Sequence, residues 1–265
     1  MLDATQYLLG SGSGALVGFV LALVGGGGSI LAVPLIVYLV GVTNPHVAIG
    51  TSAFAVAVNA ATGLASHARA GTVKWRCASV FALAGIAGAF AGSTLGKSFD
   101  GEKLLFLFAI VMIVVGVLML RRRGKEGDPD IVLARDNAGK LLGFGAGAGA
   151  FSGFFGIGGG FLVVPGLTAA TGMPMINAVG SSLVAVAAFG ATTAFNYALS
   201  GLVDWLLAAA FIAGGLVGGL AGAAAAKRLS EQRGVLTMIF AGLIFLVAIY
   251  MLWISFSEFF GEAGR

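Results

Sequence analysis

Long apolar segments that carry few charges recur along the whole chain, and they restrict its fold more than any other feature. Only helices or closed barrels satisfy their backbone hydrogen bonds inside a bilayer, and a spanning helix needs about 20 apolar residues. Hydrophobic residues make up 58% of the 265 residues and charged residues only 10%, unlike a soluble domain. The sequence therefore predicts an all-α, polytopic integral membrane protein. The apolar segments are residues 8–24, 29–41, 47–66, 77–96, 103–120, 141–155, 161–171, 175–198, 203–226 and 235–256.

Several classes of function are disfavoured by what the chain carries. The single cysteine, Cys77, has no cysteine or histidine neighbours at metal-binding spacing, so we expect no metal and no cofactor. The net charge of +4 comes from basic residues in short loops, which bears on membrane topology and does not indicate nucleic-acid binding. Ser152 in the sequence AFSG is a formal candidate nucleophile, but neither His46 nor His67 lies at membrane depth to act as its base. We therefore expect no enzyme.

The chain contains an internal repeat. LVGGGGSILAVP, at residues 23–34, aligns with FFGIGGGFLVVP, at residues 154–165, and GTVKW at 71–75 aligns with GLVDW at 201–205. Glycines and Lys97 in the first half then match glycines and Lys227 in the second. The sequence therefore predicts two homologous transmembrane halves and a short tail. Their predicted bounds are 1–120 and 141–256 for the halves, 121–140 for a linker loop, and 257–265 for the tail.

The two glycine-rich breaks interrupt apolar segments that are individually short. The pieces that flank each break fall below the length of a full span, so each pair is predicted to form a re-entrant helical hairpin. A bend within one full span is the alternative, and the sequence leaves both open. In the first arrangement each half is one glycine-broken hairpin plus three transmembrane helices.

The distribution of positive charge distinguishes inverted from parallel repeats, because cytoplasmic loops are enriched in lysine and arginine. With the hairpin arrangement and the middle loop 121–140 in the cytoplasm, 12 of the 15 basic residues lie inside. If each broken segment crosses the membrane instead, the halves become parallel and 10 lie inside. Charge therefore favours inverted repeats in a multi-pass membrane protein.

A helix that restarts at membrane depth offers unpaired backbone N–H groups with partial positive charge, which suits an anion. Restarts are predicted at Ser29 and at Gly160, and glycine lets a ligand approach the backbone closely. Close helix packing is the alternative role for a single glycine run. The residues predicted to donate backbone amides to an anion at the membrane midplane are Gly27, Gly28, Ser29, Gly158, Gly159 and Gly160.

The helix after each break carries a polar stripe at helical spacing. In the first half the stripe runs from Ser52 through Asn59, and in the second from Ser182 through Asn196. Ser52, Asn59, Ser182 and Asn196 are predicted to add side-chain hydrogen bonds to the anion. For any one of them, a hydrogen bond between helices, at about 0.6 kcal/mol, is the alternative role.

These motifs together resemble the sulfite exporter TauE/SafE family, also called the toluene sulfonate uptake permease family. The resemblance rests on GGGGSILAVP and GIGGGFLVVP, on GTSAFAVAVNA and GSSLVAVAAF after them, and on the paired G-x-V-x-W motif; it covers residues 12–252. The family moves sulfite, sulfoacetate and other sulfur-containing anions, often outward. Gly26 and Ser29 stand where the second half has Ile157 and Gly160, so the halves are expected to contribute unequally to a site.

The resemblance and the residues together imply a secondary transporter that exports a small sulfur-containing anion by alternating access around a midplane site. A passive anion channel and a transporter of an unrelated small anion are the alternatives. The expected partners are the anionic substrate and membrane lipid, without nucleic acid, and the sequence is compatible with a homo-oligomer.

Overall fold

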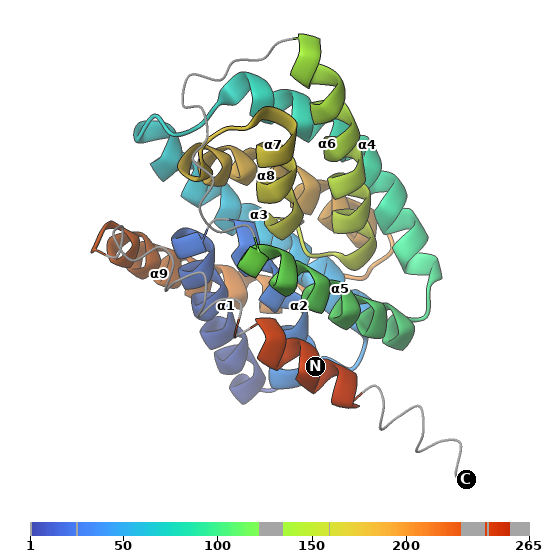
Figure 1. Ribbon diagram of the computed structural model, residues 1–265. Helices are drawn as coiled ribbons and strands as arrows, with labels where there is room; N and C mark the ends of the chain where they lie inside the picture. Colours follow the sequence, from blue (N-terminus) through green and yellow to red (C-terminus); the bar gives the residue numbers. More distant parts are fainter. Residues whose placement is uncertain are drawn as a thin grey trace.

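The computed structural model describes residues 2–24, 26–121, 135–158, 160–228, 242 and 244–254, and the regular structure in these ranges is helical (Figure 1). A 3₁₀ helix η1 (Gly26–Leu31), a short α2 (Ala32–Pro34) and a π-helical turn η2 (Leu35–Leu39) connect the first long helix to the third. A final helix covers Ile244–Ile254. The longer helices are α1 (Ala4–Val24), α3 (Pro45–Arg69), α4 (Trp75–Ser98), α5 (Gly101–Arg121), α6 (Arg135–Phe155), α7 (Gly160–Thr171), α8 (Met175–Ala198) and α9 (Trp205–Arg228).

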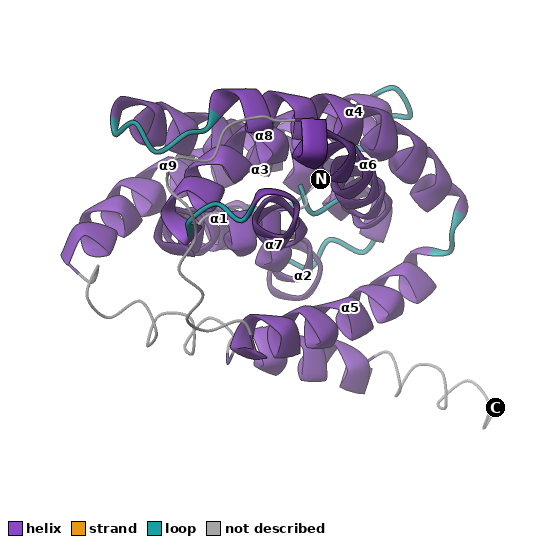
Figure 2. Cartoon of the chain, turned by 45° about the horizontal axis from the view of Figure 1, so that its top comes forward, coloured by secondary structure: helices purple, strands orange, loops and turns teal. Residues whose placement is uncertain are grey.

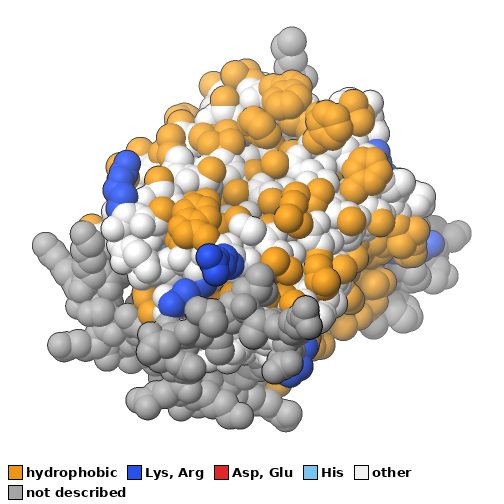
Figure 3. Space-filling model, turned by 90° about the horizontal axis from the view of Figure 1, so that it is seen from above, with side chains coloured by type: hydrophobic (Ala, Val, Ile, Leu, Met, Phe, Trp, Pro, Cys, Tyr) orange, Lys and Arg blue, Asp and Glu red, His pale blue; other side chains and the backbone are white. Residues whose placement is uncertain are grey.

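Six helices in the described ranges are long and apolar enough to cross a membrane, namely α1, α3, α4, α5, α8 and α9. Hydrophobic side chains are spread over the described part of the face seen in Figure 3, between white areas of small or polar residues and backbone, with a few lysine and arginine side chains. Large apolar side chains such as Leu220 and Leu8 are about three-quarters exposed, which is expected where lipid is the solvent. The prediction of an all-helical, polytopic membrane protein is confirmed.

The first helix of each half is longer than its apolar run. Helix α1 begins at Ala4, because Asp3 and Gln6 cap its start: the backbone N–H of each donates to the other's side chain, at 2.9 and 2.7 Å. This reciprocal pairing is a capping box. Helix α6 begins at Arg135, so the end of the predicted 121–140 loop is helical, while residues 122–134 lie outside the described residues. Each helix has 21 residues, but of the two only α1 is also apolar enough to count as a candidate membrane span.

At both glycine breaks the chain folds back on itself. Gly28 packs against the backbone of Leu21 in the preceding helix α1. At the other end of the first hairpin, Gln6 Nε2 donates to the carbonyl oxygen of Val40 at 2.9 Å. The two ends of the hairpin therefore lie next to each other. In the second hairpin, a Cβ atom at Gly166 would stand 3.8 Å from Phe144 Cβ. Both breaks are therefore hairpin turns and not bends in continuous helices.

Helices α3 and α8, which are counterparts in the repeat, pack against each other in opposite directions. A Cβ atom built on Gly50 would stand 2.9 Å from Tyr197 Cβ, one on Gly63 would stand 3.5 Å from Leu183 Cδ1, and one on Gly180 would stand 3.1 Å from the ring of His67. Residue numbers along α3 therefore rise as those along α8 fall. An antiparallel contact between counterparts requires a pseudo-two-fold axis perpendicular to both helices.

In the remaining close contacts, a helix of one half packs on a helix of the other half. Helix α1 packs on α9 and helix α6 packs on α4, as Figure 2 shows. In both pairs the residue numbers rise together, so the helices are parallel, and glycines lie directly against backbone carbonyl groups of the neighbour. The contacts pair Gly14 with Phe211, Gly18 with Gly215, Gly145 with Phe81, Gly149 with Gly85, and Gly153 with Ala89.

Each G-x-V-x-W loop is bound to the opposite half by one hydroxyl group. The Thr51 hydroxyl oxygen accepts a hydrogen bond from the backbone N–H of Asp204 at 2.9 Å. Its counterpart Ser181 accepts one from the backbone N–H of Lys74 at 2.8 Å. The motif therefore marks the starts of α4 and α9, where each helix is fixed to the other repeat.

Replacing Ser181 with alanine is expected to lower the free energy of unfolding by about 1 kcal/mol, because the amide of Lys74 loses its acceptor. The measurement is a denaturant titration of purified protein in detergent. Ser98→Ala is the matched control, since Ser98 is exposed and donates only to Leu95 in its own helix, at 2.7 Å. Equal losses in the two variants would contradict the role given to Ser181.

Candidate transport site

The two hairpin tips meet at the centre of the molecule, where η1 packs against α7. Helix α7 begins at Gly160, as predicted, whereas the first hairpin restarts at Gly26 as a 3₁₀ helix, three residues before the predicted Ser29. Gly156 and Gly158 have φ angles of +68° and +65°, a backbone conformation that glycine adopts without strain. The turn of the second hairpin therefore depends on these two glycines.

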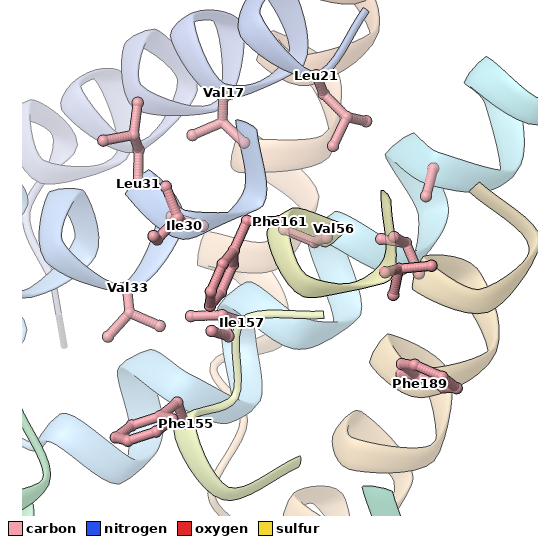
Figure 4. Packing of buried hydrophobic residues seen from close by; sticks show 14 of the residues in the cluster. Val17, Leu21, Ile30, Leu31, Val33, Val56, Phe155, Ile157, Phe161 and Phe189 are labelled. Atoms are coloured by element: carbon pink, nitrogen blue, oxygen red, sulfur yellow. The ribbon is translucent and has the colours of Figure 1, made fainter. Parts of the chain in front are cut away.

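Apolar side chains surround the two tips. Figure 4 shows Phe161 next to Ile30 and Ile157, and all three are at most 3% exposed. A Cβ atom at Gly158 would lie 2.8 Å from Val56 Cγ1. The predicted residues Gly27, Gly28, Ser29, Gly158 and Gly160 are thus brought together from both hairpins, with Gly28, Ser29 and Gly160 buried; Gly159 lies outside the described residues.

The two predicted serines donate to backbone carbonyl groups. Ser52 Oγ lies 3.0 Å from the carbonyl oxygen of Ile49 and 3.5 Å from that of Gly156, and so adjoins the second hairpin tip. Ser182 Oγ donates to Val179 at 2.7 Å. Both residues are fully buried. In this conformation both hydroxyl protons are used inside the protein.

Asn59 lies at a cavity of about 310 Å³ between α1, α3, α8 and α9. Its side chain is 3% exposed, and neither its Nδ2 nor its Oδ1 atom has a hydrogen-bond partner among the described residues. Such a group normally costs about 1 to 3 kcal/mol. Thr62, Ser66 and His67 of α3 line the same cavity, and Thr62 and Ser66 are exposed, so the cavity reaches the protein surface.

Asn196, in contrast, has its side chain fully occupied. Its Nδ2 atom donates to Ser93 Oγ at 2.6 Å and to Thr94 Oγ1 at 2.9 Å, both on α4. Its Oδ1 atom accepts from Lys97 Nζ at 2.9 Å. The antiparallel packing of α3 on α8 puts Asn59 and Asn196 toward opposite ends of that helix pair. The two predicted asparagines therefore do not share one site.

The two halves differ at the residue that lines the cavity, because Phe189 stands where the first half has Asn59. The Phe189 ring lies over Gly85 as Asn59 lies over Gly215, and it stacks on Phe81 with ring centroids 6.3 Å apart. The repeat alignment alone places Asn59 opposite Phe189. This difference between the halves is the sequence signal for a site that lies off the symmetry axis, on the Asn59 side.

Paired helix breaks whose tips meet inside a polytopic membrane protein are typical of membrane transporters. The chain belongs to the sulfite exporter TauE/SafE family of membrane transporters, whose family model matches residues 11–251. The resemblance drawn from the glycine motifs is confirmed.

Relatives from several microbes are similar over most of their length. A "Probable membrane transporter protein" of Xylella fastidiosa strain Temecula1 is 53% identical, covering 93% of this chain and 95% of the relative. "Probable membrane transporter protein YunE" of Bacillus subtilis is 28% identical, with 85% and 90% covered. No solved structure matches the chain. The family and these relatives make the protein a multi-pass membrane transporter.

Proposed function

We propose that the protein is a secondary transporter that exports a small sulfur-containing anion, such as sulfite, sulfoacetate or another organosulfonate, across the bacterial inner membrane. Alternating access between two inverted halves moves the anion through the centre of the protein. The observation that carries the proposal is the cavity of about 310 Å³ that Asn59 lines, together with an Asn59 amide that is buried and has no hydrogen-bond partner among the described residues. The family, described as sulfite exporters, supports the substrate class.

The antiparallel contact between α3 and α8 supports inverted repeats. If both helices span the bilayer, the pseudo-two-fold axis that relates them lies in the membrane plane. Parallel repeats would make these counterparts run in the same direction. The count of 12 basic residues inside under the inverted arrangement supports the same topology, with the middle loop and the cavity mouth at the C-terminal end of α3 facing the cytoplasm.

The described polar residues that line the cavity are hydrogen-bonding groups without a permanent charge. The Asn59 amide is the donor that we assign to an anion oxygen. Thr62 and Ser66 line the cavity as well, and in this conformation the Thr62 hydroxyl donates to the carbonyl oxygen of Asn59 at 2.8 Å. Leu21 lines the cavity and also packs against Gly28. Leu21 therefore lies between the cavity and the first hairpin tip. Neutral donors bind an anion more weakly than arginine does, which suits a transporter that must release its substrate.

The membrane potential supplies the driving force for export. With a negative interior, moving one negative charge outward is favourable by about 2.3 kcal/mol per 100 mV. This proposal needs no nucleotide, in keeping with a sequence that carries no G-x-x-x-x-G-K-[ST] motif.

The test is efflux from proteoliposomes loaded in turn with sulfite, sulfoacetate, taurine, sulfate and thiosulfate, under an imposed potential that is negative inside. We expect saturable efflux of a sulfur-containing anion and acceleration by the same anion outside. Flux that does not saturate and lacks exchange would identify a passive channel. Efflux of an unrelated anion, with none of the five transported, would refute the substrate class.

Replacing Gly28 with leucine is expected to prevent folding, which disqualifies it as a test of transport. A Cβ atom at Gly28 would stand 2.8 Å from Leu21 Cα and still closer to the Leu21 amide nitrogen. The measurement is the monodisperse fraction after detergent extraction, with Gly12→Leu as the control because an added Cβ there meets nothing within 4 Å. Recovery of the two variants in equal yield would contradict this packing.

A further inference from the structure

Lys97, near the end of α4, joins α4 to the end of α8. Its ammonium group donates to the carbonyl oxygen of Asn196 at 3.0 Å, to Asn196 Oδ1 at 2.9 Å and to Ser200 Oγ at 2.8 Å. These contacts use all three of its protons. The ring centroid of Tyr197 lies 5.9 Å from the same nitrogen. Together with the hydrogen bonds from Asn196 to Ser93 and Thr94, these contacts join the ends of the two helices.

The cluster of Lys97, Asn196 and Ser200 lies where the repeat places the counterpart of the cavity, and its side chains close that position. By the repeat, Asn196 is the counterpart of Ser66 and Thr193 that of Gly63. Ser66 and Gly63 line the open cavity, whereas Asn196 and Thr193 are at most 4% exposed. The cavity and the cluster also lie at opposite ends of the α3 and α8 pair. One end of the pseudo-symmetric interface is thus open while the other is closed.

The contacts of Lys97 leave its charge available. All three acceptors are neutral, so none of the three bonds compensates the positive charge. A hydrogen bond from an ammonium to an anionic oxygen is shorter and stronger than one to a neutral oxygen. An anion that reached this end of the protein would therefore compete for Lys97 with Asn196 and Ser200.

We propose that Lys97 is the gate residue at the end of the transporter opposite the cavity. Bound to Asn196 and Ser200, it holds that end closed; released from them, it binds the departing anion and the end opens. This rests on the proposed export function and adds the residue that controls the second mouth, which faces outward in the inverted topology.

The first test measures opening without any substrate. In a Cys77→Ser background, Thr193→Cys reports the closed end and Ser66→Cys reports the cavity, each through its rate of labelling by a water-soluble thiol reagent. Lys97→Met is expected to raise labelling at position 193 by about tenfold, because three charged hydrogen bonds are lost, and to lower labelling at position 66. Ser200→Ala removes one acceptor and is expected to cause a smaller shift in the same direction.

Lys103→Met is the matched control, because Lys103 is exposed near the start of the next helix, and it is expected to change neither rate. Unchanged labelling at position 193 in both Lys97→Met and Ser200→Ala would overturn the gate. If that result came with normal sulfite efflux, the gate alone would fail. A reciprocal shift with no sulfur-containing anion transported would support the gate and refute the substrate class.

The second test measures the anion-binding half of the proposal. In sulfite exchange between proteoliposomes and buffer, Lys97→Met is expected to raise the external sulfite concentration for half-maximal exchange by about tenfold, reflecting a lost charge-assisted bond. Lys97→Arg keeps the charge and is expected to restore most of the affinity. An unchanged half-maximal concentration in Lys97→Met would refute anion binding by Lys97.

Discussion

Replacing Asn59 with leucine is expected to abolish anion efflux, by more than about tenfold, while leaving the protein as stable as before or more stable. The amide is buried without a partner among the described residues, and replacing an unsatisfied buried polar group by an apolar group of similar size removes a penalty of about 1 to 3 kcal/mol. Leucine offers the anion no hydrogen bond. The measurements are sulfite efflux and thermal unfolding of the same preparation.

Asn196→Leu is the matched control, because the same change is made in the same stripe of the other half. Here the side chain is bonded to Ser93, Thr94 and Lys97, so its loss is expected to lower stability. Efflux that survives Asn59→Leu would remove Asn59 from the site. Equal destabilisation by the two variants would show that the Asn59 amide has a structural partner in solution.

Replacing Gly149 with alanine is expected to cost at least about 2 kcal/mol of stability, because overpacking forces the backbone to shift. An added Cβ at this position would overlap the backbone carbonyl of Gly85 across the interface of α6 and α4. Backbone atoms cannot rotate away as a flexible side chain does, so the two helices must separate. Thermal unfolding in detergent and the folded yield in membranes measure the loss.

Gly147 provides the control two residues away on the same helix. It is exposed, and an added Cβ meets nothing within 4 Å. Gly147→Ala is therefore expected to be neutral or slightly stabilising, since alanine favours helix over glycine by about 1 kcal/mol. If Gly149→Ala unfolded at the same temperature as Gly147→Ala, the close contact of α6 and α4 would be wrong.

Much of the fold was predictable because apolar segments and glycine breaks have local signatures. The predicted segment 175–198 coincides with α8, and the break at Gly160 coincides with the start of α7. The starts of α1 and α6 were missed because polar residues open these helices. The Asp3 and Gln6 capping box was the signal for the first of them.

The candidate site was predictable only in part, because hydrogen-bond partners depend on which helices meet. Asn59 and Asn196 look equivalent in their polar stripes, yet Asn59 lines a cavity and Asn196 is hydrogen-bonded to α4. Lys97 carries a charge at a helix end, and nothing local in the sequence shows that Asn196 and Ser200 bind it. Long-range packing decides both outcomes.

Because helices of one half pack on helices of the other half, some of these packing contacts can form only late in synthesis. The glycine face of α1 emerges first, but its neighbour α9 begins only at Trp205. Contacts between residues so distant in sequence form late, after most of the chain is made. Until then the glycine face of α1 lacks its neighbour, so the packing of the N-terminal half is completed only when the last quarter of the chain has been made.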